Sequence, residues 1–313
     1  MNLIFLYIIS GIITWISLAQ IIPILKKNFL SKPNKRSSHF TPIPTGGGIS
    51  FVLVSCFFSY FSGFLLPLYC LPLAIIGFLD DKFRVPAYLR YIFQLGTVLC
   101  ILKRSENIEN LVLNLNHNEY LLCLLFFIIF GTAIINFINF MDGLDGFICL
   151  NMILVFSFSS FTINNAIFFI VSSLVGFIFW NWAPAKVFMG DVGSTYLGAL
   201  LFGIIVNANN LLNSFSVFII ISPILCDALI CVIRRLLIGQ NIFKAHKMHL
   251  YQRLNQAGFS HSLVTALYFM MSLMLLIAVV LVNSYYIYLF LLPVILIGYI
   301  IDKKFAIPFN STK

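Results

Sequence analysis

Long, nearly uninterrupted apolar runs constrain this chain more than any other feature of its sequence. A helix needs roughly 20 apolar residues to cross about 30 Å of hydrocarbon, and such runs recur from the first residues to position 301. Only 9% of the 313 residues are charged, whereas soluble domains carry about 25%. The runs do not alternate in polarity as barrel strands do. The sequence therefore predicts an all-α, polytopic membrane protein and excludes soluble nucleotide-binding enzymes, nucleic-acid-binding modules and disulfide scaffolds.

We expect about 11 transmembrane helices, at residues 3–25, 46–63, 64–79, 88–102, 120–138, 147–163, 166–182, 195–209, 212–232, 263–283 and 286–301. These helices leave too little chain for a second domain, so residues 1–313 are expected to form one domain. Its cytoplasmic loops are expected at 26–45, 80–87, 139–146, 183–194 and 233–262.

Basic residues indicate the orientation of the chain. Of the 19 Lys and Arg residues, only Lys103 and Arg104 fall outside those loops, the helix ends beside them and the C-terminus. The positive-inside rule then places the N-terminus outside and the C-terminus inside. The net charge of +9 is explained by this topology and by contact with anionic membrane lipids, so no nucleic-acid partner is expected.

Acidic residues are sorted between the two faces. The three Glu residues lie in the external loop 103–119, whereas all seven Asp residues lie at the cytoplasmic face. Helix C-termini carry partial negative charge, which disfavours carboxylates there. Pairing with Arg84 and Arg234 is one source of compensation. The other is a divalent ion, and oxygen ligands favour Mg²⁺, or Mn²⁺, over Zn²⁺.

Two motifs carry most of these aspartates. GFLDD at 77–81 places Asp80 beside Asp81, with Arg84 about one helical turn later, a group suited to a metal and a phosphate. NFINFMDGLDG at 136–146 has polar residues at intervals of three, which share one helix face while the helix lasts: Asn136, Asn139, Asp142 and Asp145. Amides both donate and accept hydrogen bonds, as recognition of a nucleobase or sugar requires. A solvated loop and a polar helix end are the alternatives.

Two further segments bear glycines at the start of a predicted helix. In FMGDVGS at 188–194, Asp191 either caps the helix or lies beside a phosphate bound by free N–H groups, and Phe188 is placed to stack on a base. The basic segment 32–39 leads into PTGGG at 44–48. This loop is either a positive-inside anchor or a place of close backbone approach.

The largest cytoplasmic loop contains the sequence HKMHLYQRL. His246 and His249 can face one ligand, with Lys247 and Arg253 nearby. A solvated face is the alternative, and zinc is disfavoured because no third His or Cys stands close in the sequence. The seven Cys residues lie in apolar segments without C-x-x-C spacing, and we interpret them as small apolar residues of helices.

Taken in this order, PTGGG, GFLDD, NxxNxxDGxDG and FMGDVGS resemble the polyprenyl-phosphate N-acetylhexosamine-1-phosphate transferase superfamily (glycosyltransferase family 4). That superfamily includes phospho-MurNAc-pentapeptide translocase and undecaprenyl-phosphate GlcNAc-1-phosphate transferases. The resemblance covers residues 1–300 and implies transfer of a sugar 1-phosphate from a UDP-sugar to undecaprenyl phosphate. It also implies release of UMP, a Mg²⁺ cofactor and an active site on the cytoplasmic face of a bacterial inner membrane.

The resemblance also implies roles for individual residues. Asp80, Asp81 and Asp191 would be the catalytic residues and the metal ligands. The substrate-binding residues would be Arg84, Asn136, Asn139, Asp142, Asp145, Phe188, His246, Lys247, His249 and Arg253, with Phe188 against uracil. A homodimer stays an open alternative to a monomer.

The His-containing loop departs from the pattern of the translocase branch, and two other classes of membrane protein are alternatives. The translocase branch has three consecutive His residues where this chain has HKMH followed by LYQRL, which favours the branch that starts O-antigen over peptidoglycan synthesis. An intramembrane prenyltransferase would leave HKMH and PTGGG without a role. A secondary transporter would place binding groups near the midplane and often show internal repeats, neither of which the sequence displays.

Overall fold

The computed structural model describes residues 3–31, 41–113, 115–241, 246–282 and 285–309. Within these residues, helices and one small hairpin make up the regular structure, which confirms the all-α prediction. The helices are α1 (Leu3–Asn28), α2 (Ile49–Phe61), α3 (Leu66–Tyr69), α4 (Leu71–Phe83), α5 (Ala87–Lys103), α6 (Glu106–Val112), α7 (His117–Met141), α8 (Phe147–Thr162), η1 (Asn165–Ile167), α9 (Phe168–Asn181), α10 (Gly190–Val206), α11 (Leu211–Leu237), α12 (Leu250–Gln256), α13 (His261–Val282), η2 (Tyr285–Phe290) and α14 (Leu291–Lys304). The antiparallel strands are β1 (Leu30–Ser31) and β2 (Ile43–Pro44), with Leu30 opposite Pro44.

Membrane character is evident in the helices themselves. By length and composition, α1, α7, α11 and α13 are able to cross a membrane, and α2, α8, α9 and α10 are shorter apolar helices. Each range expected to span overlaps at least one helix of the structure. The chain is therefore a multi-pass membrane protein, while the number of crossings and the orientation stay predictions.

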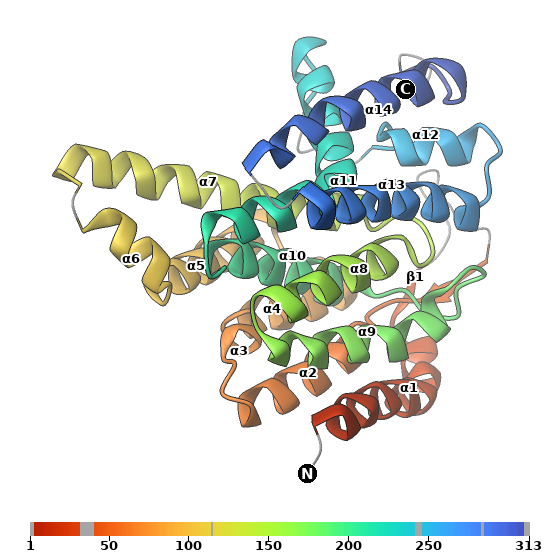
Figure 1. Cartoon of the computed structure of the whole chain (residues 1–313). Coiled ribbons are helices and arrows are strands. Elements are labelled where there is room, and N and C mark those ends of the chain that lie inside the picture. Colours follow the sequence, from red (N-terminus) through yellow and green to blue (C-terminus); the bar gives the residue numbers. More distant parts are fainter. Residues whose placement is uncertain (1–2, 32–40, 114, 242–245, 283–284, 310–313) are drawn as a thin grey trace.

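Helix α10 lies at the centre of the molecule (Figure 1). Every residue from Val192 to Val206 is buried, and α4 and α7 make the most extensive contacts with it. A helix that is apolar on all sides requires neighbours on all sides. The position of α10, and of the motif at its N-terminus, therefore depends on the helices packed around it.

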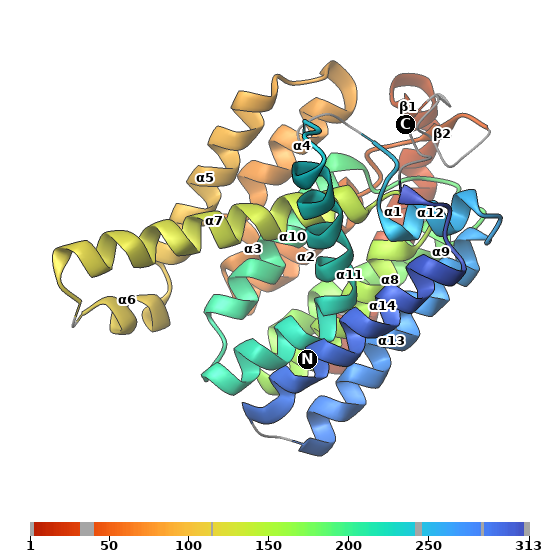
Figure 2. The ribbon, with the colours of Figure 1, turned by 90° about the horizontal axis from the view of Figure 1, so that it is seen from above.

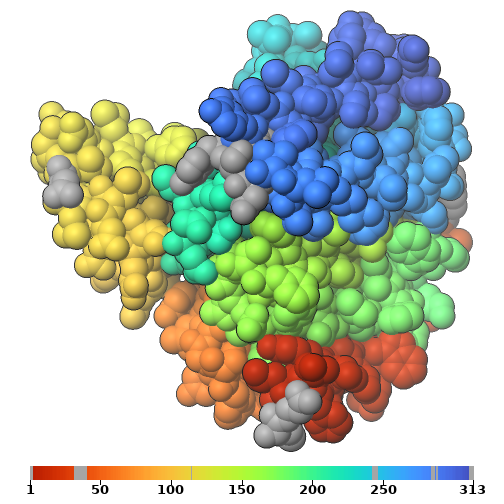
Figure 3. Space-filling model, viewed as in Figure 1, coloured from red at the N-terminus to blue at the C-terminus, as the bar shows by residue number. Residues whose placement is uncertain are grey.

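The outer helices enclose this centre in pairs. Helix α1 packs along α9, α8 lies between α9 and α13, and α11 contacts both α13 and α14. Helix α6 and the first half of α7 project from the body in two perpendicular views (Figures 1 and 2). Figure 3 shows this projecting lobe, in yellow, standing apart from the rest of the surface.

Helix ends differ from the expected loop boundaries at four places. Asp80 and Asp81 lie in the last turn of α4, Asp191 lies in the first turn of α10, α7 continues to Met141, and α11 continues to Leu237. An apolar run stops at its first polar residue, whereas the backbone hydrogen bonds of a helix continue beyond it. Residues 32–40 of the expected first loop lie outside the described residues.

Gly77 permits a close approach between α4 and α10. A Cβ at this position would lie 2.5 Å from the carbonyl oxygen of Asp191 and 2.7 Å from the amide nitrogen of Val192. No other residue type fits without separating the two helices. Small residues serve this purpose widely between membrane helices.

We expect Gly77→Ala to destabilise the protein by about 1–3 kcal/mol, the usual cost of overpacking, because α4 must move away from α10. The measurement is the thermal unfolding midpoint of the purified protein in detergent. The matched control is Gly96→Ala on α5, where a Cβ would meet no atom within 4 Å. Equal losses in the two variants would contradict the close contact.

Candidate active site

The PTGGG segment lies directly against the FMGDVGS segment. The amide of Phe188 donates to the carbonyl of Pro44 at 2.9 Å, and the amides of Gly47 and Gly48 donate to Phe188 and Met189 at 2.9 Å each. Strand β2 is thus connected to the residues that immediately precede α10. Two motifs that are about 140 residues apart in the chain form one backbone layer at this end of the bundle.

Asp81 holds the N-terminus of α10. Its Oδ1 accepts hydrogen bonds from the amide of Asp191 at 3.1 Å and from Thr45 Oγ1 at 3.3 Å, and its Oδ2 accepts from the amide of Val192 at 3.4 Å. Gly190, with φ of +74°, lets this carboxylate contact the backbone. The first amides of a helix lack partners within the helix and carry partial positive charge. Asp81 therefore positions Asp191.

Arg90 lies between the carboxylates of Asp80 and Asp191. Its Nη1 is 2.9 Å from Asp80 Oδ2 and 3.5 Å from Asp191 Oδ2. Asp80 also accepts a hydrogen bond from the amide of Val85 at 2.6 Å. The three aspartates of GFLDD and FMGDVGS are thus brought together, as the sequence predicted, with a cation from α5 beside them.

Negative charge exceeds positive charge at this junction. Among the described residues, the ion pairs to Asp80 and Asp191 come from Arg90 alone. Asp142 is near enough to be affected: burial, then the charges of Asp81 and Asp145, raise the pKa of Asp142 to about 8. A further cation at this place would relieve the repulsion.

The two arginines suggested as partners lie elsewhere. Arg84 is exposed and ends α4 with φ of +53°, and no ion pair from it to an acidic residue is found in the described part of the chain. Arg234 pairs with Asp302 at 2.6 Å. Arg234 therefore compensates Asp302, as the sequence suggested for one of the aspartates, but neither arginine compensates Asp80, Asp81 or Asp191 in the described part of the chain.

The two asparagines of the NFINFMDGLDG motif lie in different environments. Asn139 accepts a hydrogen bond from Ser194 of FMGDVGS at 2.8 Å, which connects it to the aspartates. Asn136 exchanges two hydrogen bonds with Gln94 of α5, at 2.9 and 3.2 Å. Helix α7 ends at Met141, so the expected common face does not continue to the later residues.

Asp145 is buried and already has partners. Its Oδ2 accepts from the amide of Ala185 at 3.0 Å, and its Oδ1 lies 3.2 Å from His261 Nδ1. These contacts join the loop after α7 to the loop before α10 and to the start of α13. The structure thus gives Asp145 a role in positioning loops, which its spacing alone did not indicate.

The HKMH loop lies against the end of α7. Tyr251 donates a hydrogen bond to the carbonyl of Phe140 at 2.9 Å and stacks on Phe147 with ring centroids 5.0 Å apart. His246 and His249 stack on each other at 4.9 Å. The half-buried Lys247 lies between them in the chain, and Phe188 is also half-buried.

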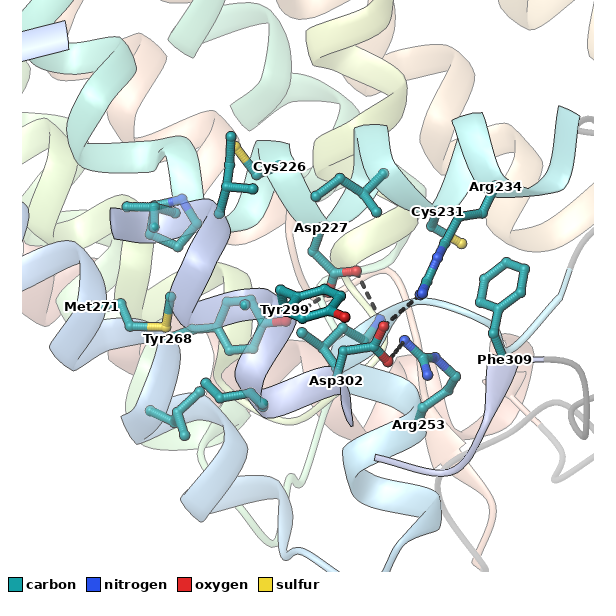
Figure 4. Close-up of a pocket in the computed structure, with 18 of the residues that line it drawn as sticks. Cys226, Asp227, Cys231, Arg234, Arg253, Tyr268, Met271, Tyr299, Asp302 and Phe309 are labelled. Carbon is teal, nitrogen blue, oxygen red and sulfur yellow. Dashed lines mark hydrogen bonds and ion pairs between the residues drawn. The ribbon is translucent and has the colours of Figure 1, made fainter. Parts of the chain in front are cut away.

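Buried ionic contacts hold this loop in place. Asp227 of α11 accepts from the amides of Leu250 and Tyr251 at 2.7 and 3.1 Å and from the Tyr268 hydroxyl at 2.7 Å. Arg253 contacts Asp302 and donates to the carbonyls of Met248 and Ile307. Figure 4 shows Asp302 between Arg234 and Arg253, beside a cavity of about 340 Å³ between α11, α13 and α14. Arg253 is thus engaged in connecting the loop to the C-terminal segment.

The oxygen donors fit a divalent cation best at Asp191. Its side chain is 31% exposed, with a long contact to Arg90 and a contact with Asp80, whereas the side chain of Asp80 is 12% exposed and has close contacts with Arg90 and with the amide of Val85. Both oxygens of Asp81 accept backbone hydrogen bonds. Asp191, assisted by Asp80, is the group suited to a metal, and Asp81 is suited to positioning.

Sequence reasoning left three participants out of the predicted site. Arg90 and Gln94 stand four residues apart on one face of an apolar helix, and this polar pair was the available signal. Tyr251 carried no signal beyond its place in the loop. Its contact with Gly143 depends on how α12 is placed in space.

We expect Asp142 to make the stability of the protein fall as the pH rises from about 4 to about 8. Its pKa is raised to about 8, so the folded state binds the proton more tightly than the unfolded state in this window. The contribution is at most about 1.4 kcal/mol per pH unit. The measurement is thermal unfolding against pH in buffer with EDTA.

Asp142→Asn should make this pH dependence less steep, because the contribution of Asp142 is lost. The matched control is Glu109→Gln, which removes an exposed carboxylate on α6 and should keep the wild-type slope. An unchanged slope in Asp142→Asn would contradict the raised pKa.

The chain is similar in sequence to known proteins over the residues that contain these motifs. The model of glycosyl transferase family 4 matches residues 63–209, which include the aspartates of GFLDD, NFINFMDGLDG and FMGDVGS. A probable undecaprenyl-phosphate N-acetylglucosaminyl 1-phosphate transferase of Bacillus subtilis is 26% identical over 310 residues, covering 88% of this chain and 85% of the relative. An undecaprenyl-phosphate alpha-N-acetylglucosaminyl 1-phosphate transferase of Thermotoga maritima is 32% identical, covering 56% of each chain. A phospho-N-acetylmuramoyl-pentapeptide-transferase of Streptococcus mutans is 30% identical, covering 62% of this chain and 70% of the relative. With the motifs gathered as described, the chain belongs to glycosyl transferase family 4, as its sequence predicted.

Proposed function

We propose that this protein transfers the 1-phosphate of an N-acetylhexosamine-type sugar from a UDP-sugar to undecaprenyl phosphate and releases UMP. The observation that carries the proposal is the meeting of Asp80, Asp81 and Asp191 at the junction of α4 and α10, with Arg90 between two of them. The names of the Bacillus and Thermotoga relatives support the polyprenyl phosphate acceptor and the sugar class.

We infer that Mg²⁺, with Mn²⁺ as an alternative, is the cofactor. Asp191 and Asp80 would hold it, because carboxylate oxygens are the ligands that this ion prefers and Asp191 is the more accessible of the two. The bound ion would neutralise charge on the diphosphate and on the departing UMP. Asp81 would keep the α10 N-terminus, and with it Asp191, in place.

Besides the metal ion, side chains of the protein would promote the transfer by positioning the substrates and by neutralising charge. Phosphoryl transfer depends mainly on these two factors. Burial lowers the pKa of His246 to about 3 and that of His249 to about 4, so both imidazoles are neutral at pH 7 and would act through hydrogen bonds. The second pKa of a phosphate monoester is about 6, so the acceptor phosphate is mostly dianionic and needs no strong general base.

We place the reaction at the cytoplasmic face of a bacterial inner membrane, as the first step of a surface polysaccharide such as O-antigen. The HKMH sequence, in place of three consecutive His residues, supports this branch. The Streptococcus relative, named as a phospho-N-acetylmuramoyl-pentapeptide-transferase, makes UDP-MurNAc-pentapeptide the second candidate donor.

The test incubates purified protein with undecaprenyl phosphate and isotope-labelled UDP-GlcNAc or UDP-MurNAc-pentapeptide, with Mg²⁺ or EDTA. We expect label in the lipid fraction, one UMP per lipid product, and loss of both with EDTA. Asp191→Asn should lower kcat by about 100-fold or more, because several kcal/mol of charge stabilisation are lost, while the unfolding temperature is kept.

The control variant is Glu106→Gln on the exposed helix α6, which should transfer at the wild-type rate. Full activity of Asp191→Asn at ordinary Mg²⁺ would refute the metal assignment. A label that crosses a vesicle membrane but never enters lipid would refute the transferase and favour a transporter.

A further inference from the structure

Three potential metal ligands outside the aspartate site converge in space. Cys231 of α11 and the two histidines of the HKMH loop, His246 and His249, each offer one ligand atom, and these atoms lie within 4.8 Å of one another. The sequence separates the cysteine from the nearer histidine by 15 positions. Within the described part of the chain, this is the group of at least three His, Cys, Asp or Glu side chains whose ligand atoms come this close together.

The two imidazoles have nitrogen atoms available for a ligand. His246 uses Nδ1 to accept the amide of Met248 at 3.2 Å, which leaves Nε2 unused by that bond. His249 is 2% exposed, and its Nδ1 has no hydrogen-bond partner among the described residues. A buried polar atom without a partner is uncommon in folded proteins and calls for an explanation. A bound cation nearby would supply one.

A carboxylate supports the histidine side of the group. Asp227 Oδ1 lies 3.9 Å from His249 Nδ1, and both side chains are buried. Because Nδ1 is the atom without a hydrogen-bond partner among the described residues, it is the ligating nitrogen in this arrangement, and the Asp227 carboxylate places negative charge beside a bound cation. Asp227 is fixed by the α12 amides and by Tyr268, so it is a rigid neighbour.

The cations in this region are already engaged. Arg235 donates to the Gln240 side chain at 3.1 Å and to the carbonyl of Asn241 at 2.6 Å. Arg234 pairs with Asp302, and Figure 4 shows its guanidinium directed to Asp302, with Cys231 also on α11. The positive charge that would repel a metal ion is therefore partly offset by local acceptors.

We propose that Cys231, His246 and His249 form a second metal site, selective for a borderline-soft divalent ion of the Zn²⁺ class. One thiolate and two imidazoles are ligands that Zn²⁺ prefers over oxygen-seeking Mg²⁺. On binding, the sulfur–metal bond forms and the thiol proton leaves to solvent. No electron transfer is involved. The fourth position stays available for water or for an anionic oxygen.

The bound ion would connect α11 to the HKMH loop. Because the proposed function uses that loop for substrate, the ion would inhibit transfer by restraining Lys247 and withdrawing both histidines. This consequence rests on the proposed function, whereas binding of the ion does not. The two are therefore tested separately.

The binding test titrates Co²⁺ into purified full-length protein freed of metal with EDTA. A cobalt ion bound by one thiolate and two imidazoles is expected to give a thiolate-to-cobalt charge-transfer band in the near ultraviolet, saturating at one equivalent, and Zn²⁺ should abolish it. Cys231→Ser and His249→Ala should lose the band, while Cys226→Ser, on the same helix but outside the group, should keep it.

Thermal unfolding gives a second readout that needs no substrate. Zn²⁺ should raise the unfolding temperature of the wild type and of Cys226→Ser, but not that of Cys231→Ser. A missing cobalt band in the folded wild type, or a band that persists in Cys231→Ser, would overturn the site. If binding occurs but Zn²⁺ leaves transfer unchanged at saturating Mg²⁺, the inhibitory role falls and the metal site stands.

Discussion

The contact between the C-terminal turn of α4 and the N-terminal turn of α10 is the constraint on which the site depends. Asp81 lies at the negative end of its own helix, an unfavourable place, but its oxygens accept the free amides at the positive end of α10. The close approach at Gly77 makes this exchange geometrically possible. Asp80 and Asp191 are adjacent as a result, and Arg90 offsets only part of their charge.

The HKMH loop is held in place by contacts between residues of the protein itself. Asp227 holds the start of α12 from within α11, and Asp302 connects Arg234 and Arg253 to the C-terminal helix. These buried groups place the HKMH loop over the end of α7, where Tyr251 reaches the carbonyl of Phe140. The same framework brings Cys231 to the two histidines, so loop positioning and the proposed metal site have one structural origin.

Prediction from sequence succeeded for features that extend over long apolar runs or that concentrate several polar residues in a short motif. Apolar runs indicated helices throughout the chain because the membrane demands satisfied backbone groups inside each segment. Four ordered motifs identified Asp80, Asp81, Asn139 and Asp191, which the fold gathers in one place. The sequence was less informative about where helices end and about which side chains pair with the aspartates. Arg84 was expected beside the aspartates, and Arg90 is there instead.

The sequence by itself determined the helical membrane architecture, the family and the identity of the acidic residues, since periodicity, hydropathy and local motifs are properties of neighbouring positions. Only the tertiary structure decided which carboxylate caps a helix, which one remains accessible, and which cysteine approaches two histidines. These outcomes depend on how helices distant in the chain pack around α10. Distances across that packing follow from the shapes of many side chains together, and no local pattern encodes them.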